Sequence, residues 1–221
     1  MGTIKNPFIK IAVVGGTEFD SKRGAEILRQ KGIPCDAIGI SLQPQEQAEL
    51  YRHTEKLTRV FHEKAGSLYY HHLVLFCNSL SFAAPWDTLY PGRITELTAV
   101  YKKLLKQINP AHTAIVVAEP STKTQIEKLA AKHKICPPEA LHIFPRLDLI
   151  LQLEKEDETI QRQLILQEIK DLQRQGFSEI ILGCTHLDHP DFYKFKDVKI
   201  HQPGLEMMDA FVALYQSQTV R

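Results

Sequence analysis

Short apolar runs alternate along the chain with longer segments whose apolar residues recur at helical spacing. We interpret the short runs as β-strands at residues 8–14, 35–40, 71–76, 112–117, 140–144, 179–182 and 198–200. Strands that alternate with helices form βαβ units, whose strands are parallel. The pattern therefore predicts an α/β fold with a mainly parallel sheet flanked by helices.

Three of the longer segments end directly before a glycine. They cover residues 21–31, 44–65 and 154–175, and the glycines are Gly32, Gly66 and Gly176. Glycine adopts the left-handed conformation that commonly terminates a helix. Each segment is therefore predicted to be one helix.

The two halves of the chain repeat the same order of elements. The first half runs through "IAVVGGT", "KGIPCDAIGI" and "HLVLFCNS", and the second through "AIVVAEPST", "HKICPPEALHIF" and "SEIILGCT". The interval from Val14 to Cys77 is 63 residues, and that from Val117 to Cys184 is 67. Chance similarity between two βαβ regions is the alternative. The matched cysteines favour duplication into two similar lobes related by a pseudo-twofold axis: residues 1–108, on which helix 204–221 packs back, and residues 109–203.

Composition excludes several classes of partner. Of the 221 residues, 43% are hydrophobic and 24% charged, and the net charge is +1. The basic group Lys102, Lys103 and Lys106 has the spacing of a solvated helix face, so no nucleic-acid partner is expected. No apolar run is long enough to span a bilayer, and the N-terminus lacks the pattern of a signal peptide. We expect a cytoplasmic protein without a membrane partner, and the oligomeric state stays open, a homodimer included.

Four cysteines lie at positions 35, 77, 136 and 184. In a reducing compartment they are not expected to form disulfides. We assign Cys35 and Cys136 to packing, since free cysteine behaves as a small hydrophobic residue. Cys77 and Cys184 differ, because each follows a predicted strand and precedes polar residues, in "CNS" and "CTH". Ligands of parallel sheets bind outside the carboxyl ends of the strands, so two lobes facing each other would present two thiols to one ligand.

At these strings the sequence resembles the aspartate/glutamate racemase family. "FCNSLSFAAPWDTL" is similar to the family's "CNTA" segment, and "IILGCTHLDHP" to its "LGCTH" or "LGCTE" segment. "AIVVAEPST" is similar to the "LATxxT" loop and "VKIHQPGLEMMDAF" to the closing "IDP" strand and helix. The resemblance spans nearly the whole chain, although only the two cysteine motifs are specific.

The resemblance implies racemisation of an acidic amino acid without a cofactor. A racemase removes the Cα proton from one face of its small-molecule substrate and returns a proton to the other. Without pyridoxal phosphate the carbanion has no electron sink. Because one base cannot reach both faces of the carbon, two acid/base groups are needed. Cys77 and Cys184 would supply them, because a thiol with an ordinary pKa of about 8.5 needs little tuning to serve as acid or base. The "CTH" triplet favours glutamate, whereas the chain length is nearer that of aspartate racemases.

Each thiol is expected to have a helper. His186, two residues after Cys184, is the candidate for the second thiol, in agreement with the role that the resemblance implies. For Cys77 the candidate is Asp20, since "FDS" is similar to the "FDSG" of glutamate racemases. The alternative is an aspartate-racemase opening, in which Thr17 takes the leading position and Asp20 is a helix N-cap.

Hydrogen-bond donors for the substrate are implied by family positions and are Ser21, Asn78, Ser79, Thr122 and Thr185. The sequence departs from the family at Glu119, which usually is Thr, and again after His186, where "LDHP" replaces a shorter "YP". Both departures put the identity of the substrate in doubt.

Other chemistries fit the sequence less well. Cys184, His186 and His189 approach a zinc-ligand spacing, but no second cluster completes the site, so no metal is expected. The dinucleotide motif G-x-G-x-x-G is absent. Asp148 is an ordinary loop acid or a further assisting carboxylate. The alternatives that remain are an isomerase of another small carboxylate or a hydantoin, and a binding protein without catalytic activity.

Overall fold

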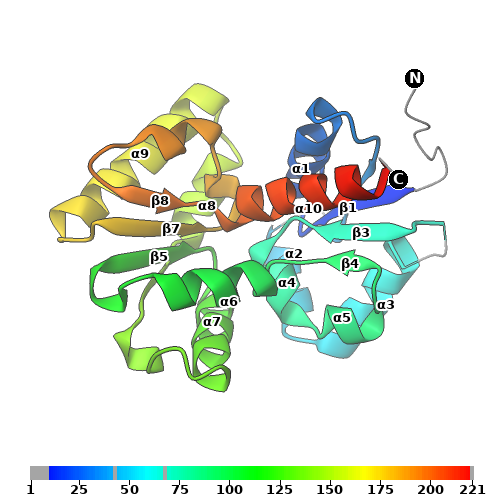
Figure 1. Cartoon of the computed structure of the whole chain (residues 1–221), viewed down its shortest axis with the longest axis horizontal. Helices are drawn as coiled ribbons and strands as arrows, with labels where there is room; N and C mark the ends of the chain where they lie inside the picture. The colour runs from blue at the N-terminus through cyan, green and yellow to red at the C-terminus, as the bar shows by residue number, and fades with distance from the viewer. Residues whose placement is uncertain (1–9, 42–43, 67–68, 220–221) are drawn as a thin grey trace. The chain divides into compact units, whose positions relative to one another are not determined.

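The computed structural model describes residues 10–41, 44–66 and 69–219, and the chain divides into two compact units (Figure 1). One unit contains residues 1–97 and 206–221, and the other contains residues 98–205. Each holds a four-stranded parallel sheet flanked by helices. The predicted α/β class with two similar lobes is confirmed.

The first unit is built around strands β1 (Ile11–Gly15), β2 (Asp36–Gly39), β3 (His72–Leu75) and β4 (Ile94–Thr95), in the order β2-β1-β3-β4. Its helices are α1 (Glu18–Gln30), α2 (Pro44–Tyr51), α3 (Thr54–Lys64), α4 (Asn78–Ala83), α5 (Trp86–Leu89) and most of α10 (Pro203–Thr219). Helix α10 packs on this unit, and Phe211 stacks on His72 of β3 with ring centroids 5.2 Å apart.

The second unit repeats this topology with strands β5 (Thr113–Val117), β6 (His142–Pro145), β7 (Glu179–Gly183) and β8 (Lys199–His201), in the order β6-β5-β7-β8. Its α-helices are α6 (Thr98–Gln107), α7 (Pro120–Lys132), α8 (Leu147–Leu153) and α9 (Glu158–Arg174). Short 3₁₀ helices are η1 (Pro110–His112), η2 (Pro138–Ala140), η3 (Thr185–Leu187) and η4 (Pro190–Lys194). Helix α6 belongs to this unit, whereas the boundary expected at residue 108 placed it in the first lobe. Helix α6 packs on α7, and a Cβ at Gly183 of β7 would meet its Tyr101 hydroxyl at 2.7 Å.

Strand register gives the two units equivalent positions for their cysteines. Val14 pairs with Leu75 in the first sheet, and Val116 pairs with Leu182 in the second. Each leucine lies two residues before a cysteine, Cys77 in one unit and Cys184 in the other. Each cysteine therefore follows the third strand of its sheet, β3 in the first unit and β7 in the second.

Several predicted boundaries are wrong. The helix expected at 44–65 is two helices, because His53 leaves the helical region with φ −123° and ψ 83°. The helix expected at 154–175 begins at Glu158, because the Asp157 side chain accepts the backbone N–H groups of Thr159 and Ile160 as an N-cap. Residues 8 and 9 of the first expected strand, and 220 and 221 of the last helix, lie outside the described residues. Strand β4 has only two residues and was not predicted.

The cores are apolar side chains between each sheet and its helices. In the first unit α3 contributes Leu57 and Phe61, and Phe61 contacts Trp86 with ring centroids 4.2 Å apart. In the second unit α9 contributes Ile165, Ile169 and Leu172. None of the described helices is long and apolar enough to cross a membrane.

Candidate active site

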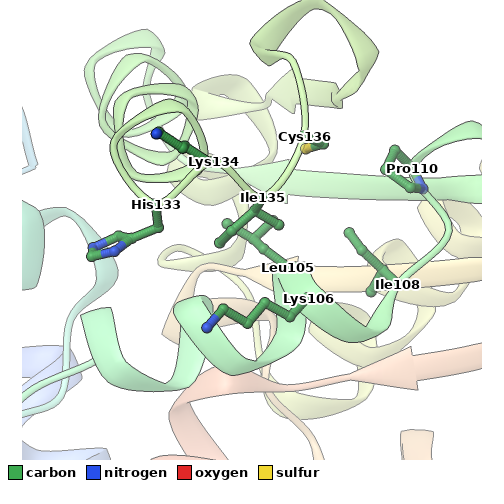
Figure 2. A pocket seen from close by; sticks show the side chains of 8 residues that line it. All are labelled: Leu105, Lys106, Ile108, Pro110, His133, Lys134, Ile135 and Cys136. Carbon is green, nitrogen blue, oxygen red and sulfur yellow. The ribbon is translucent and has the colours of Figure 1, made fainter.

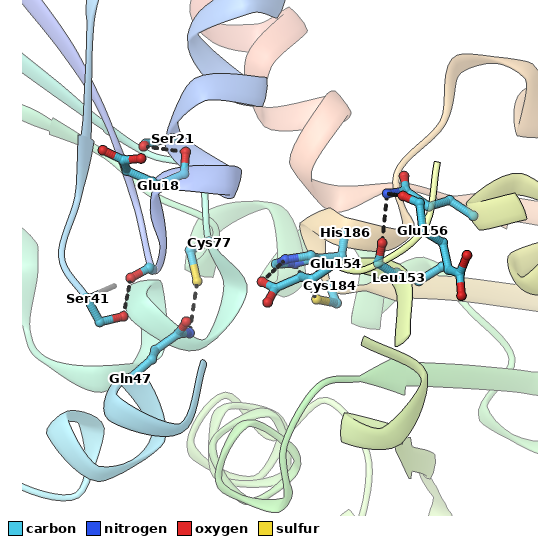
Figure 3. A network of polar contacts seen from close by, with 12 residues as sticks. Glu18, Ser21, Ser41, Gln47, Cys77, Leu153, Glu154, Glu156, Cys184 and His186 are labelled. Carbon is cyan, nitrogen blue, oxygen red and sulfur yellow. Dashed lines mark hydrogen bonds and ion pairs between the residues drawn. The ribbon is translucent and has the colours of Figure 1, made fainter. Parts of the chain in front are cut away.

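Cys77 lies at the carboxyl end of β3, in extended backbone directly before α4. Its side chain is buried, with 4% exposed. Two side chains of α2 contact the sulfur. The Gln47 amide donates from Nε2 at 3.7 Å (Figure 3), and the Tyr51 hydroxyl lies 3.7 Å away. We name these three residues the first thiol site.

The loop after β1 ends at Thr17, and Asp20 and Ser21 lie in the first turn of α1 at the same edge of the sheet. Strand β1 is the neighbour of β3, and the Phe76 N–H donates to the Val14 carbonyl just before Cys77. All three residues are buried. A Cβ at Gly15 would meet the Asp20 Cβ at 2.7 Å and the Ser21 nitrogen at 2.4 Å, so only glycine allows this close approach.

The reading of Asp20 as an N-cap is wrong, because Thr17 occupies the N-cap position and Asp20 is the third residue of α1. The Thr17 side chain makes no capping bond, and its buried hydroxyl has no hydrogen-bond partner among the described residues. Asp20 remains a predicted helper of Cys77. Ser21 donates to the Glu18 carbonyl at 3.0 Å.

Asn78 and Ser79 are the first two residues of α4, directly after Cys77, and both are buried. The local sequence therefore places an amide and a hydroxyl beside the thiol. Their predicted role as substrate donors stays a prediction.

Cys184 follows β7 and occupies the N-cap position of the short helix η3. Its sulfur lies 3.6 Å from Nδ1 of His186, and Nε2 of the same imidazole lies 2.8 Å from Oε1 of Glu154 (Figure 3). The side chains of His186 and Glu154 are 6% and 17% exposed. These three residues, the second thiol site, form a chain of thiol, imidazole and carboxylate.

Polar residues of the neighbouring strand end accompany the second thiol site. Val117 pairs with Gly183, so the residues that follow both strands leave the sheet at the same edge. Glu119 occupies the N-cap position of α7, Thr122 lies in its first turn, and Thr185 follows Cys184. All three are buried, and a Glu119 oxygen accepts from the Ser121 hydroxyl at 3.1 Å. A carboxylate is therefore fixed at the position where the family that the sequence resembles usually has a neutral threonine.

Three functional candidates were missed by the sequence analysis: Gln47, Tyr51 and Glu154. They lie 30, 26 and 32 residues from the side chains they contact. The available signal was weak: Gln47 is polar and lies one helical turn from Tyr51, on the helix that buries Leu50. Glu154 was predicted to begin a helix, whereas it follows the last residue of α8.

Asp148 and His189 belong to neither thiol site as defined. Asp148 is 76% exposed and pairs with Arg146. Burial opposes ionisation of Asp148, but the hydrogen bond and charge of Arg146 together with backbone N–H groups outweigh burial and lower the pKa. His189 accepts the backbone N–H of Asp191 and so caps η4. Within the described ranges, no group of three or more His, Cys, Asp or Glu residues could hold a metal ion.

The other two thiols have different surroundings. Burial raises the pKa of Cys35, and its thiol donates to the Ala25 carbonyl. Cys136 lines a pocket of about 320 Å³ together with Leu105, Ile108 and Ile135 (Figure 2). Burial, and then nearby Glu139, raise the pKa of Cys136. Neither thiol is favoured as a thiolate near neutral pH.

Comparison with known proteins gives matches in structure alone: no family model and no curated protein matches the sequence. Glutamate racemase isoform RacE1 from Bacillus anthracis is 17% identical, with a TM-score of 0.59 over 96% of this chain and 83% of that one. Picrophilus torridus aspartate racemase is 10% identical, with a TM-score of 0.63 over 96% and 99%. Allantoin racemase from Klebsiella pneumoniae is 16% identical, with a TM-score of 0.58 over 93% and 88%. The chain therefore has the fold shared by the aspartate, glutamate and allantoin racemases.

Proposed function

We propose that this protein is a cofactor-independent racemase in which Cys77 and Cys184 act as the two acid/base groups. The observation that carries the proposal is their equivalent placement. Each thiol lies two residues beyond a leucine in the same register of the same sheet topology. Each is buried, and each contacts a polar side chain that can stabilise it or exchange its proton.

Two such groups fit a reaction at a carbon that must be approached from both sides. One thiolate would remove the Cα proton of the substrate, and the other thiol would donate its proton to the other face of the carbanion. Before the next turnover of the same enantiomer, the thiol that took up the Cα proton must lose a proton to solvent, and the thiolate left on the other cysteine must gain one. For the opposite enantiomer the roles of the thiols reverse.

The second thiol site supports proton transfer because it links three groups in series. His186 can accept the Cys184 proton at Nδ1, and the Glu154 carboxylate then stabilises the imidazolium at Nε2. Glu154 also fixes the orientation of the ring. Glu154 therefore acts on Cys184 through His186.

Neutral donors support binding of a carboxylate substrate. Negative charge that develops at the carbanion is best stabilised by donors already in place. Asn78 and Ser79 would serve in the first unit, and Thr122 and Thr185 in the second, with Ser21 as a further donor. We propose an acidic amino acid as substrate, with glutamate tested ahead of aspartate.

Glu119 favours a second candidate, a neutral cyclic amide or ureide. A fixed carboxylate beside the second thiol site repels a second carboxylate of the substrate. It can accept a hydrogen bond from a substrate N–H group instead. Two of the similar structures are allantoin racemases. Glu119→Thr would then shift activity toward acidic amino acids, whereas an unchanged preference would remove this candidate.

The decisive experiment is exchange of the Cα proton in heavy water, followed by NMR. Both enantiomers of glutamate, aspartate and allantoin are tested with wild type, Cys77→Ser and Cys184→Ser. Cys35→Ser is the matched control, since its thiol lies outside both thiol sites. Exchange with inversion that both site variants lose and the control retains would support the proposal. Ligand binding without any exchange would instead favour a binding protein.

A further inference from the structure

Helix α2 contacts the sulfur of Cys77 through two side chains that no motif had singled out. Gln47 and Tyr51 lie four residues apart, so they share one face of the helix. Each has a polar atom 3.7 Å from Sγ. Figure 3 shows the Gln47 amide directed at the sulfur.

The position of the Gln47 amide is set by Gly16, in the loop between β1 and α1. Only 9% of Gln47 is exposed. A Cβ at Gly16 would lie 2.6 Å from the Gln47 amide carbon and nitrogen, so the glycine leaves the space that the amide fills. The Gly16 carbonyl is held by the Ser41 backbone N–H at 3.0 Å and by its hydroxyl at 2.7 Å. Because Gly16 and the Cys77 sulfur both lie close to the Gln47 amide, its N–H group points in one direction.

The chemistry of these contacts favours the anion. An amide N–H can only donate, and a thiolate accepts a hydrogen bond more strongly than a neutral thiol does. The Tyr51 hydroxyl can donate to the thiolate or accept from the thiol, so it serves both protonation states. The second thiol site has an imidazole and a carboxylate instead.

We infer that Gln47 and Tyr51 are positioning residues that hold Cys77 and stabilise its thiolate, so that the two thiols are tuned by different chemistry. The inference rests on the proposed function for its catalytic meaning. Neutral donors from α2 stabilise the thiolate of Cys77, whereas Cys184 exchanges its proton with His186.

The test measures alkylation of individual cysteines by iodoacetamide at neutral pH, with peptide mass spectrometry. Gln47→Glu keeps the shape of the side chain and removes the donor, and Tyr51→Phe removes only the hydroxyl. The matched control is Gln107→Glu, at an exposed position of α6 in the other unit. We expect the Cys77 rate to fall about 3- to 10-fold in Tyr51→Phe and at least as far in Gln47→Glu, with Cys184 and the control unchanged.

The ratio of the Cys77 and Cys184 rates separates this role from a structural one. Equal changes of both rates, or a ratio within about twofold of wild type in folded variants, would overturn the inference. If Gln47→Glu does not fold, Tyr51→Phe alone decides. The measurement needs no substrate. Absence of Cα exchange in the wild-type protein would therefore count against the proposed function while the ratio still tests the role of α2.

Discussion

Replacing Glu154 by Gln tests the chain of thiol, imidazole and carboxylate at the second thiol site. Glutamine keeps the volume and one hydrogen bond to His186 but removes the negative charge. The contact spans 2.8 Å between Nε2 and Oε1, and the two side chains are 6% and 17% exposed. Little water therefore screens the pair, so the negative charge of Glu154 stabilises any imidazolium that forms on His186.

The expected magnitude follows from the geometry. A hydrogen bond to a charged group contributes about 1.5–3 kcal/mol, and each 1.4 kcal/mol corresponds to about a tenfold change in rate. Glu154→Gln should therefore lower kcat/KM by roughly 10- to 100-fold. Both directions of racemisation must fall equally, because enantiomers have equal free energies in solution.

Two assays check this result. Cα exchange in heavy water reports turnover, and alkylation of Cys184 relative to Cys77 reports the second thiol without any substrate. Asp148→Asn is the matched control, since this acid lies on α8, the helix that Glu154 directly follows, but is 76% exposed. A folded Glu154→Gln protein that keeps both rates within about twofold of wild type would refute the reasoning.

Two further predictions concern stability. Burial opposes ionisation of Glu179, but hydrogen bonds from Lys199, His201 and a threonine outweigh it and lower its pKa from 4.5 to about 2. Because the folded pKa is the lower one, this carboxylate contributes about 3 kcal/mol above pH 4.5, and the contribution is lost as the pH falls through 2. In urea denaturation Glu179→Gln should be destabilised by that amount at pH 7 and by less at pH 3, whereas an equal loss at both pH values would contradict the pairing. Gly24→Ala would place a Cβ 2.8 Å from the Phe76 ring, so overpacking of about 1–3 kcal/mol should exceed the gain in helix propensity; a higher melting temperature would disprove the close contact.

The sequence by itself determined the fold class and the location of two cysteines at the ends of strands. Apolar runs that alternate with amphipathic segments specify βαβ units, because each element must bury its apolar face. Cys77 and Cys184 were located because a cysteine followed by polar residues at the end of an apolar strand is a local pattern. His186 lies near Cys184 for the same reason, since two residues along the chain keep the imidazole within reach of the sulfur.

Tertiary structure decided what each thiol contacts. Gln47 and Tyr51 reach Cys77, and Glu154 reaches His186, only because strands and helices far apart in sequence are packed together. Local spacing gives the face of a helix but not which strand end that face meets. Tertiary packing also put Thr17 at the N-cap of α1, where the sequence had offered Asp20 as the N-cap. The start of a helix depends on where the chain leaves the preceding strand, and that point is fixed by pairing with neighbouring strands rather than by the residues of the loop.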